Sequence, residues 1–571
     1  MRPSMKRPLV LLCTFILLGL SCSGQAYTRY KIVFTDKNGT PFSLNEPQAY
    51  LSARAILRRQ RQGIPVDSTD LPIVPRYIDS VMAAGPVTLL NHCNWLNQIV
   101  IQTSDPAALG RIAALPFVKA ADSIGLRRAA PLETVPADKF SREKALPQTL
   151  RIRNIQEQSA LDYGASYAQI HLHHGDFLHD KGLLGQGMVI AMLDAGFDGI
   201  NTNRALDSLF MQQRLLYTWN YVYDTSYVFA YHWHGANCLS IIASDLPGQM
   251  IGSAPRASFL LLLTEDVRSE QPIEEDNWAA AAQFADSAGA DLITSSLGYS
   301  LFDNPAYNLS YSDLNGKVAD ISIAASLAVK KGMIVVNAAG NDGLDSWKHI
   351  IAPADGYGVL AVGAVDAREN IAPFSSFGPT ADGRISPVVA SVGWNTDLVD
   401  TSGMVTTGSG TSYATPNMAG LVACLWEAFP NLTNYQILTA VEKSADHYSD
   451  PGDQIGFGVP DFEIAYDSLQ QIEQNSVQAH VDSILGTSEL KVFPNPFNGL
   501  FHIAFRSALS GPALCAMYDA SGRMVAEQSL EVTAGTDHLL DWNLPGEPDG
   551  LYFVRITLGS QTLVAKVIHT R

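Results

Sequence analysis

The strongest constraint on the fold is a series of short apolar segments in the middle of the chain. Five of these segments contain no charged residue, namely 188–193, 259–263, 292–296, 333–336 and 359–362. Continuous runs of this kind are typical of strands buried on both faces. Helical patterns at 277–288 and 321–331 lie between them. Strands that alternate with amphipathic helices predict a parallel sheet covered on both faces, in an α/β domain of about 300 residues.

The segments before and after the α/β domain have different patterns of apolar and polar residues. Before the α/β domain, strand patterns at 30–34 and 99–102 and helical patterns at 49–61 and 105–115 predict a small α+β domain. The segment that follows this domain, 131–147, contains prolines and residues of both charges and is expected to be an exposed linker. After the α/β domain, short alternating strands such as 501–505 and 551–556 are separated by Gly, Asn and Asp turns, which predicts an all-β sandwich. We divide the chain into a signal peptide (1–26), a basic domain (27–150), the α/β domain (151–470), a linker (471–488) and the sandwich (489–571).

The charge is unevenly distributed. The whole chain has 38 basic and 56 acidic residues and a net charge of −18. This balance excludes nucleic acid as an expected partner, because binding to phosphates needs a basic face. Residues 27–150 hold 15 basic and 10 acidic residues, whereas residues 151–480 hold 14 and 37. Complementary charge speeds and orients association, so the first segment is expected to bind the second.

The N-terminus has the features of an export signal. A basic start is followed by the apolar stretch 9–20, which is too short to span a bilayer, and by a cleavage site after Ala26. A lipoprotein anchored through Cys22 is the alternative. Four further cysteines, Cys93, Cys238, Cys424 and Cys515, show no metal-type spacing. Cys238 and Cys424 are expected either to form a bridge or to remain buried thiols.

Four segments each place a polar residue and a glycine after an apolar run or at the start of a helix. They are Leu193-Asp194-Ala195-Gly196, His234-Gly235-Ala236-Asn237, Asn337-Ala338-Ala339-Gly340-Asn341 and Gly408-Ser409-Gly410-Thr411-Ser412-Tyr413-Ala414-Thr415-Pro416. Ligands of open α/β sheets bind beyond the carboxyl ends of the strands. These four segments are therefore expected to converge on one site.

The order Asp, His, Ser with these neighbours resembles the subtilase (subtilisin-like) serine proteases. Gly410-Thr411-Ser412-x-Ala414-x-Pro416 matches the nucleophile motif of that family, and Ala339-Gly340-Asn341 matches its oxyanion segment. Ser296-Leu297-Gly298 matches the segment that lines the substrate groove. The resemblance covers about residues 165 to 470, roughly half of the chain.

The resemblance implies a role for each matching residue. Ser412 is the expected nucleophile, His234 the base that takes its proton, and Asp194 the group that orients the imidazole. The amide of Asn341 and the backbone N–H of Ser412 are expected to stabilise the oxyanion. Substrate is expected to contact Ser296, Leu297, Gly298, Ala339 and Gly340, in a pocket that we predict to be open and apolar.

The sequence departs from the family pattern at two places. Ala195 follows the aspartate where the family usually has Ser or Thr, and Ala236-Asn237 replaces the usual Thr-His. Both changes remove side chains near the three catalytic candidates, so altered activity is expected rather than its loss. His232 lacks a following glycine and is not expected to be the base. The histidines at 171, 173, 174 and 179 are expected on a polar helix face, and no metal or cofactor is assigned.

The flanks carry resemblances of their own. The basic segment 27–150 resembles the propeptides of secreted bacterial subtilases, which assist folding and block the groove until they are cleaved. An ordinary accessory domain is the alternative. The C-terminal motifs Pro494-Asn495-Pro496-Phe497 and Gly550-Leu551-Tyr552-Phe553-Val554 resemble the sorting domain of the type IX secretion system. A carbohydrate- or matrix-binding sandwich is the alternative there.

These observations predict a secreted or cell-surface serine endopeptidase made as a zymogen. Its expected partners are protein or peptide substrates, its own propeptide and the type IX secretion machinery. A pseudoprotease, which would be a surface binding protein on the same scaffold, is the alternative from another class. An esterase using the same residues is a third option, because acyl transfer to water is the same chemistry.

Overall fold

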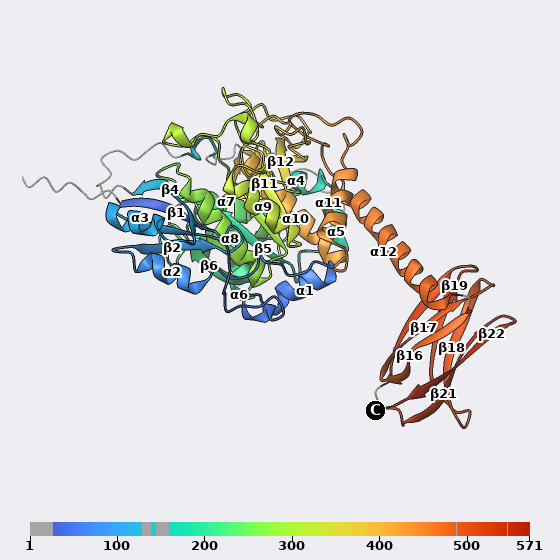
Figure 1. Ribbon diagram of the computed structural model, residues 1–571. Helices are drawn as coiled ribbons and strands as arrows, with labels where there is room; N and C mark the ends of the chain where they lie inside the picture. Colours follow the sequence, from blue (N-terminus) through green and yellow to red (C-terminus); the bar gives the residue numbers. More distant parts are fainter. Residues whose placement is uncertain (1–26, 128–138, 144–158, 487, 545, 571) are drawn as a thin grey trace, which may run out of the picture.

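A computed structural model describes residues 27–127, 139–143, 159–486, 488–544 and 546–570 (Figure 1). Three parts follow one another along the chain: a small α+β domain, a central α/β domain and a C-terminal all-β domain. The predicted signal peptide, 1–26, lies outside the described residues, as do parts of the predicted linker at 131–138 and 144–147. Within the described ranges, no helix combines the length and the hydropathy needed to cross a membrane.

The central sheet has seven parallel strands in the order β13-β12-β11-β10-β5-β9-β6. Five of them coincide with the five apolar segments of the sequence. The predicted fold class is therefore confirmed. The strands are β5 (Val189–Asp194), β6 (Leu215–Asn220), β9 (Ser258–Leu263), β10 (Leu292–Ser295), β11 (Ile334–Ala338), β12 (Leu360–Val365) and β13 (Val389–Val392).

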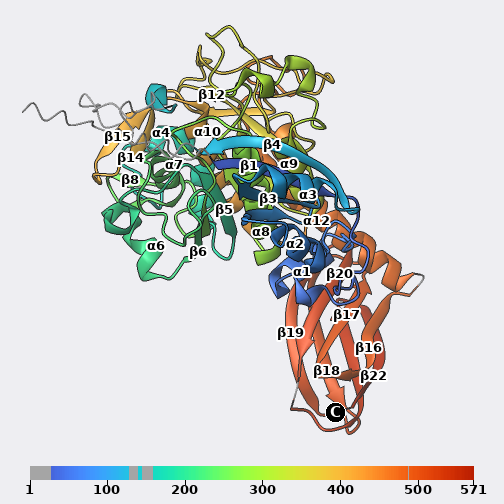
Figure 2. The same ribbon diagram turned by 60° about the vertical axis from the view of Figure 1, so that its left-hand side comes forward.

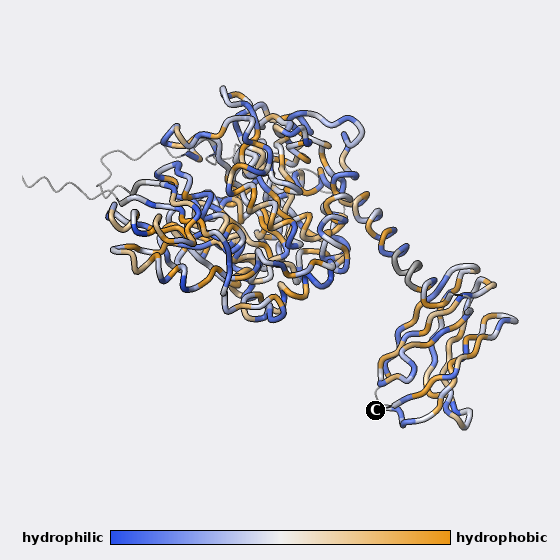
Figure 3. Tube along the Cα trace, viewed as in Figure 1, coloured by the Kyte–Doolittle hydropathy of each residue, from blue (hydrophilic) through white to orange (hydrophobic). Residues whose placement is uncertain are grey.

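Helices cover both faces of this sheet. In β5, Ile190 and Met192 pack into the core with α7 (His234–Ala243) and α10 (Thr411–Ala428). Ala191 and Leu193, on the opposite face, pack with α8 (Ile273–Ala288) and α9 (Asp320–Lys330). Figure 3 shows the apolar residues gathered inside this domain. The remaining elements are α4 (Tyr167–His171), α5 (Gly175–Asp180), α6 (Asp207–Met211), α11 (Asn434–Lys443), β7 (Asp245–Leu246), β8 (Met250–Ile251) and the hairpin β14 (Thr396–Val399) with β15 (Val405–Gly408).

The N-terminal domain has an antiparallel sheet in the order β2-β3-β1-β4, which lies beside α8 and α9 (Figure 2). Polar contacts join the two domains there. Lys31 pairs with Asp320 at 2.5 Å, and the Gln98 amide donates to Asp276 at 2.5 Å. The elements are β1 (Tyr27–Phe34), β2 (Thr88–Cys93), β3 (Gln98–Thr103), β4 (Val118–Arg127), α1 (Ala53–Arg61), α2 (Pro75–Met82) and α3 (Pro106–Ala113).

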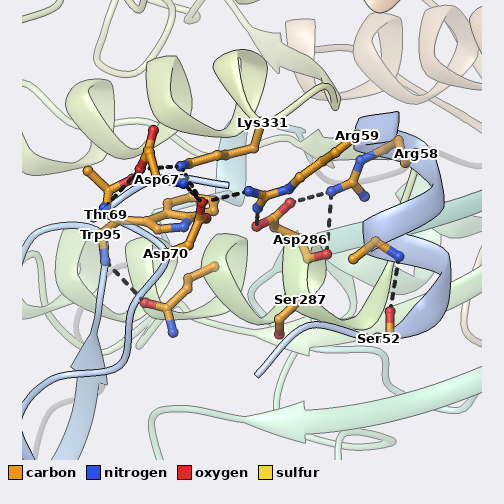
Figure 4. Close-up of polar contacts among 12 residues, drawn as sticks. Ser52, Arg58, Arg59, Asp67, Thr69, Asp70, Trp95, Asp286, Ser287 and Lys331 are labelled. Atoms are coloured by element: carbon orange, nitrogen blue, oxygen red, sulfur yellow. Dashed lines mark hydrogen bonds and ion pairs between the residues drawn. The ribbon is translucent and has the colours of Figure 1, made fainter. Parts of the chain in front are cut away.

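A row of buried charges ties α1 to α8 (Figure 4). Arg58 and Arg59 of the N-terminal domain both bind the carboxylate of Asp286 on α8. Arg59 also binds Asp70 at 2.7 Å, and Asp70 accepts from Lys331 of the α/β domain at 2.9 Å. The side chains of all five residues are at most 4% exposed. Positive and negative groups alternate, so each buried charge has a partner, as burial requires.

The C-terminal domain is joined to the rest by one long helix, α12 (Phe462–Leu485), which occupies most of the predicted linker (Figure 1). The start of α12 packs on the α/β core through Phe462, Ala465 and Leu469. Its end contacts the sandwich, whose strands have the order β19-β18-β21-β22-β16-β17-β20. These are β16 (Leu490–Asn498), β17 (Leu500–Arg506), β18 (Gly511–Asp519), β19 (Met524–Val532), β20 (Asp537–Asn543), β21 (Gly550–Leu558) and β22 (Gln561–His569).

The histidines near residue 175 do not form one polar helix face, and that expectation is wrong. The chain turns between α4 and α5, because His174 adopts a left-handed conformation. His173 is fully buried and bonds Ser391 Oγ and the Pro460 carbonyl, while His179 is buried against Tyr163. Burial lowers the pKa of both imidazoles to about 4, so they are neutral core residues.

Candidate active site

The three predicted catalytic residues are buried and lie on β5, α7 and α10, which pack against one another. Asp194 is the last residue of β5, His234 the first of α7, and Ser412 the second of α10. His234 Nδ1 lies 2.7 Å from Asp194 Oδ1. A β-carbon on Gly235 would come within 2.4 Å of a backbone oxygen and 2.9 Å of the Asp194 side chain, so glycine is what permits this approach. The structure thus brings Asp194 and His234 into contact, and Ser412 is joined to α7 through the thiol of Cys238, which donates to the Ser412 carbonyl.

The carboxylate of Asp194 is only partly supported. Oδ1 accepts from the backbone N–H of Ala195 at 2.7 Å and faces His234. Oδ2 is buried and has no hydrogen-bond partner among the described residues. Ala195, which follows this aspartate, contributes only its backbone N–H to the carboxylate.

The backbone around Ser412 is held by groups from two other segments. Pro416 lies inside α10 and has no N–H, so the carbonyl of Ser412 receives no helical hydrogen bond from it. That carbonyl instead accepts from Ser296 Oγ at 2.8 Å and from the Cys238 thiol at 3.3 Å. Among the described residues, the hydroxyl of Ser412 has one hydrogen-bond partner, the Ser296 carbonyl at 3.4 Å.

Asn341 is oriented by the residue before Ser412. Its Oδ1 accepts from the backbone N–H of Thr411 at 2.8 Å and from the Thr411 hydroxyl at 3.0 Å. With the oxygen held in this way, the amide Nδ2 is directed into the cavity, where it donates to Glu143 Oε1 at 2.6 Å. An amide donor fixed in this position suits the binding of a developing negative charge.

A cavity of about 270 Å³ opens beside these groups. Ser296, Leu297, Gly298 and Gly340 line it together with Asn341 and Ser412. Ala339 does not: it is fully buried in the core layer of α8 and α9, so its expected contact with substrate is not supported. Glu265 and Glu270 also line the cavity, so the pocket is more acidic than the apolar one expected from the sequence.

A short segment of the N-terminal part of the chain, with Lys139, Phe140 and Glu143, forms one wall of this cavity. Phe140 stacks on the ring of His234, with ring centroids 4.0 Å apart. Glu143 Oε2 lies 3.1 Å from His234 Nε2, and its backbone carbonyl accepts from the Tyr413 hydroxyl at 2.6 Å. The expectation of an exposed linker is therefore wrong for Phe140 and Glu143, which are both 8% exposed. The segment carries no motif, and an aromatic residue inside a polar stretch was the only available signal.

Asp194 and Glu143 together favour the charged form of His234. Burial by itself lowers the pKa of the imidazole, but the carboxylates of Asp194 and Glu143 outweigh it and raise that pKa to about 10. At neutral pH His234 is therefore an imidazolium held between two carboxylates. In this arrangement it cannot accept a proton from Ser412.

Three further residues considered in the sequence, His232, Cys238 and Cys424, have structural contacts: the Cys424 thiol donates to the Ser253 carbonyl. His232 Nδ1 accepts from the backbone N–H of His234 at 3.3 Å. Cys238 and Cys424 are both buried free thiols, so the alternative without a bridge is confirmed. Burial raises the pKa of both thiols well above the usual value, so neither is a thiolate at neutral pH.

Comparison with known proteins gives three matches to family models. The model of the subtilase family matches residues 185–486, more than half of the chain. The peptidase S8 propeptide domain of Bacteroidota matches residues 29–138, and the secretion system C-terminal sorting domain matches residues 491–570. The sorting domain indicates secretion or a cell-surface location.

Two individual relatives share less than a third of the aligned residues with this chain. A thermophilic serine proteinase of Bacillus sp. (strain AK1) is 29% identical over 287 residues, which cover 50% of this chain and 62% of that protein. A thermostable alkaline protease of Halalkalibacterium halodurans is 26% identical over 274 residues, covering 48% and 66%. The chain thus spans less than two thirds of either relative. A crystal structure of MycP1 with its N-terminal propeptide removed has a TM-score of 0.43 and 20% identity, covering 52% of this chain and 96% of that one.

Proposed function

The chain belongs to the subtilase family, and on that premise we propose that it is a serine endopeptidase made as a zymogen, which hydrolyses peptide bonds through an acyl-enzyme on Ser412. The observation that carries the proposal is the hydrogen bond of 2.7 Å between the buried His234 and Asp194, together with Ser412 at the start of α10, the helix that packs on α7. The family match supports the same conclusion.

In the proposed reaction, Ser412 Oγ attacks the carbonyl carbon of the peptide bond and passes its proton to His234 Nε2. The negative charge on the substrate oxygen is stabilised by the Asn341 amide and the backbone N–H of Ser412. His234 then protonates the leaving amine, and a water molecule hydrolyses the acyl-enzyme by the same route. Asp194 keeps the imidazole in the required tautomer and stabilises its charge.

The N-terminal domain acts in this proposal as an intramolecular inhibitor. Glu143 occupies both groups that the reaction needs, since its carboxylate binds His234 Nε2 and the Asn341 amide. It also keeps His234 protonated, which removes the general base. Cleavage of the chain between the two domains and release of this segment would free both groups and activate the enzyme. The C-terminal domain would direct export through the type IX machinery.

A fluorophosphonate probe, which reacts with activated serines, tests this proposal on the purified full chain. We expect labelling of Ser412 together with shortening of the chain near residues 120–165, both seen by intact-mass analysis. The Ser412→Ala variant should show neither. Glu143→Gln should label at least about tenfold faster before any shortening, because a neutral amide no longer holds the imidazolium.

Asp122→Asn is the matched control, since Asp122 is an exposed carboxylate of the same domain and should leave the labelling rate unchanged. A protein that is not labelled even after limited proteolysis has removed the N-terminal segment would overturn the protease proposal and favour the pseudoprotease. Turnover of esters without any turnover of amides would favour the esterase.

A further inference from the structure

Lys139 places its ammonium group among three carboxylates of the α/β domain. Its Nζ contacts Glu265 Oε1, lies 2.8 Å from Glu270 Oε2 and 3.4 Å from Glu274 Oε1. The side chains of Glu265 and Glu274 are at most 1% exposed, and that of Glu270 is 23% exposed. The cation comes from the inhibitory segment, and all three anions come from the domain that the segment blocks.

The α/β domain itself holds two of these carboxylates in place. Glu274 accepts from the backbone N–H groups of Asp266 at 2.7 Å and of Gln271 at 2.9 Å. Glu265 Oε2 accepts from the Tyr299 hydroxyl at 2.5 Å. These bonds leave Glu265 Oε1 directed at the ammonium, so the cluster is arranged independently of Lys139.

The cluster belongs to the same cavity as Ser412. Glu265 and Glu270 line that cavity together with Ser296 and Asn341. Lys139 immediately precedes Phe140, which stacks on His234, and the segment continues to Glu143 at the Asn341 amide. The segment thus follows a path over the catalytic groups that an extended substrate could take.

We propose that Glu265, Glu270 and Glu274 form a subsite that binds the Lys or Arg side chain of a substrate, and that Lys139 fills this subsite in the precursor. The inference rests on the proposed function. Release of the segment leaves three neighbouring carboxyl groups in a largely buried site without their cation, and such a cluster either takes up protons or gains a new positive partner.

The electrostatics of the cluster agree with this assignment. Burial raises the pKa of Glu274 to about 8, and Lys139 acts against that rise. A cation in the subsite therefore favours the ionised form of Glu274, although burial still outweighs the effect of Lys139. The same oxygens lie close enough together to hold a metal ion, which is the other occupant that the test must distinguish.

Fluorogenic peptides that carry Lys, Arg, norleucine or Glu at each of three positions before the cleaved bond test the subsite on the processed enzyme. At one position we expect kcat/KM for Lys and Arg to exceed that for norleucine by about tenfold to a hundredfold, with Glu cleaved most slowly. Glu270→Gln should reduce this ratio to below about threefold. Glu270 is partly exposed, so the variant should fold, which its fluorophosphonate labelling verifies.

Asp266→Asn is the matched control, because Asp266 is a carboxylate of the same loop that pairs with Arg268. It should keep the preference for Lys and Arg. Equal cleavage of the four peptides at every position would overturn the subsite and leave the protease proposal standing. Calcium that stabilises the wild type but not Glu270→Gln, without any preference for basic peptides, would overturn it in favour of a metal site. Failure to cleave any peptide would contradict both proposals.

Discussion

The two flanking domains are attached to the α/β domain in opposite ways. The N-terminal domain lies along α8 and α9, is tied to them by buried ion pairs, and sends Glu143 to the catalytic histidine candidate. The C-terminal sandwich meets one end of α12 through a small apolar cluster of Val481, Leu485 and Ala504. An ion pair between Arg506 and Asp482, both more than a third exposed, adds to that contact.

This difference corresponds to different tasks. A domain that must recognise and block a site needs many complementary contacts, and buried charges specify a single arrangement. A sorting domain needs only to be carried and presented, for which a helix with a small contact is sufficient. The first interface should therefore respond strongly to single substitutions and to pH, whereas the second should hardly respond.

The largest effect is expected for Asp286→Ala in the full chain with Ser412→Ala. The substitution leaves the guanidinium groups of Arg58 and Arg59 buried without their shared carboxylate. Breaking a buried pair of this kind costs about 3–5 kcal/mol. Opening of the N-terminal domain should become easier by that amount, which native-state hydrogen exchange of β1 to β4 measures. With Asp122→Ala as the exposed control, unchanged exchange in Asp286→Ala would show that the ion pairs do not hold the domain.

A smaller effect is expected from pH. Burial and the neighbouring Asp320 raise the pKa of Asp276 to about 8, against the opposing influence of Lys31 and of the Gln98 hydrogen bond. Exposure on release returns that pKa towards its usual value near 4, so closure of the N-terminal domain takes up a proton. Closure should therefore weaken as the pH rises from about 5 to 8.

The imidazole of His234 also makes closure of the N-terminal domain weaker as the pH rises. Its pKa is raised to about 10 by Asp194 and Glu143 against burial, and release removes only Glu143, so the pKa falls on opening and closure takes up a proton here as well; this contribution to the closed form is lost as the pH approaches 10. Hydrogen exchange of Ser412→Ala between pH 5 and 9 measures the combined effect, and Asp276→Asn should flatten the slope below pH 8. If the N-terminal domain instead binds more tightly at alkaline pH, the raised pKa values of both Asp276 and His234 would be contradicted.

The smallest effect is expected at the other interface. Asp482→Ala removes the ion pair that Arg506 makes with α12, while Arg506 keeps its bond to Asp537. Exposed pairs contribute about 0–1 kcal/mol, so the unfolding free energy of the sandwich should change by less than 1 kcal/mol in a denaturant titration. A larger loss would mean that the sandwich depends on α12 for its stability, and the contrast between the two domains would disappear.

The sequence predicts best where one local rule decides the outcome. The apolar run that ends at Asp194 could only be a buried strand, and the glycine after His234 and the motif around Ser412 marked the starts of two helices. Prediction failed at His173, because local polarity does not reveal that Ser391 and Pro460 enclose the ring. The predicted substrate contact of Ala339 finds no support, because this residue is buried in the core layer of α8 and α9.

The sequence alone determined the order of the domains and the central sheet, because strand burial and turn residues are local properties, and its family motifs singled out Asp194, His234 and Ser412 as catalytic candidates. The tertiary structure alone decided that Glu143 caps His234 and that Lys139 lies among Glu265, Glu270 and Glu274. Contacts between residues more than 90 positions apart depend on how whole domains pack, and that packing arises from charges and shapes that no local pattern records.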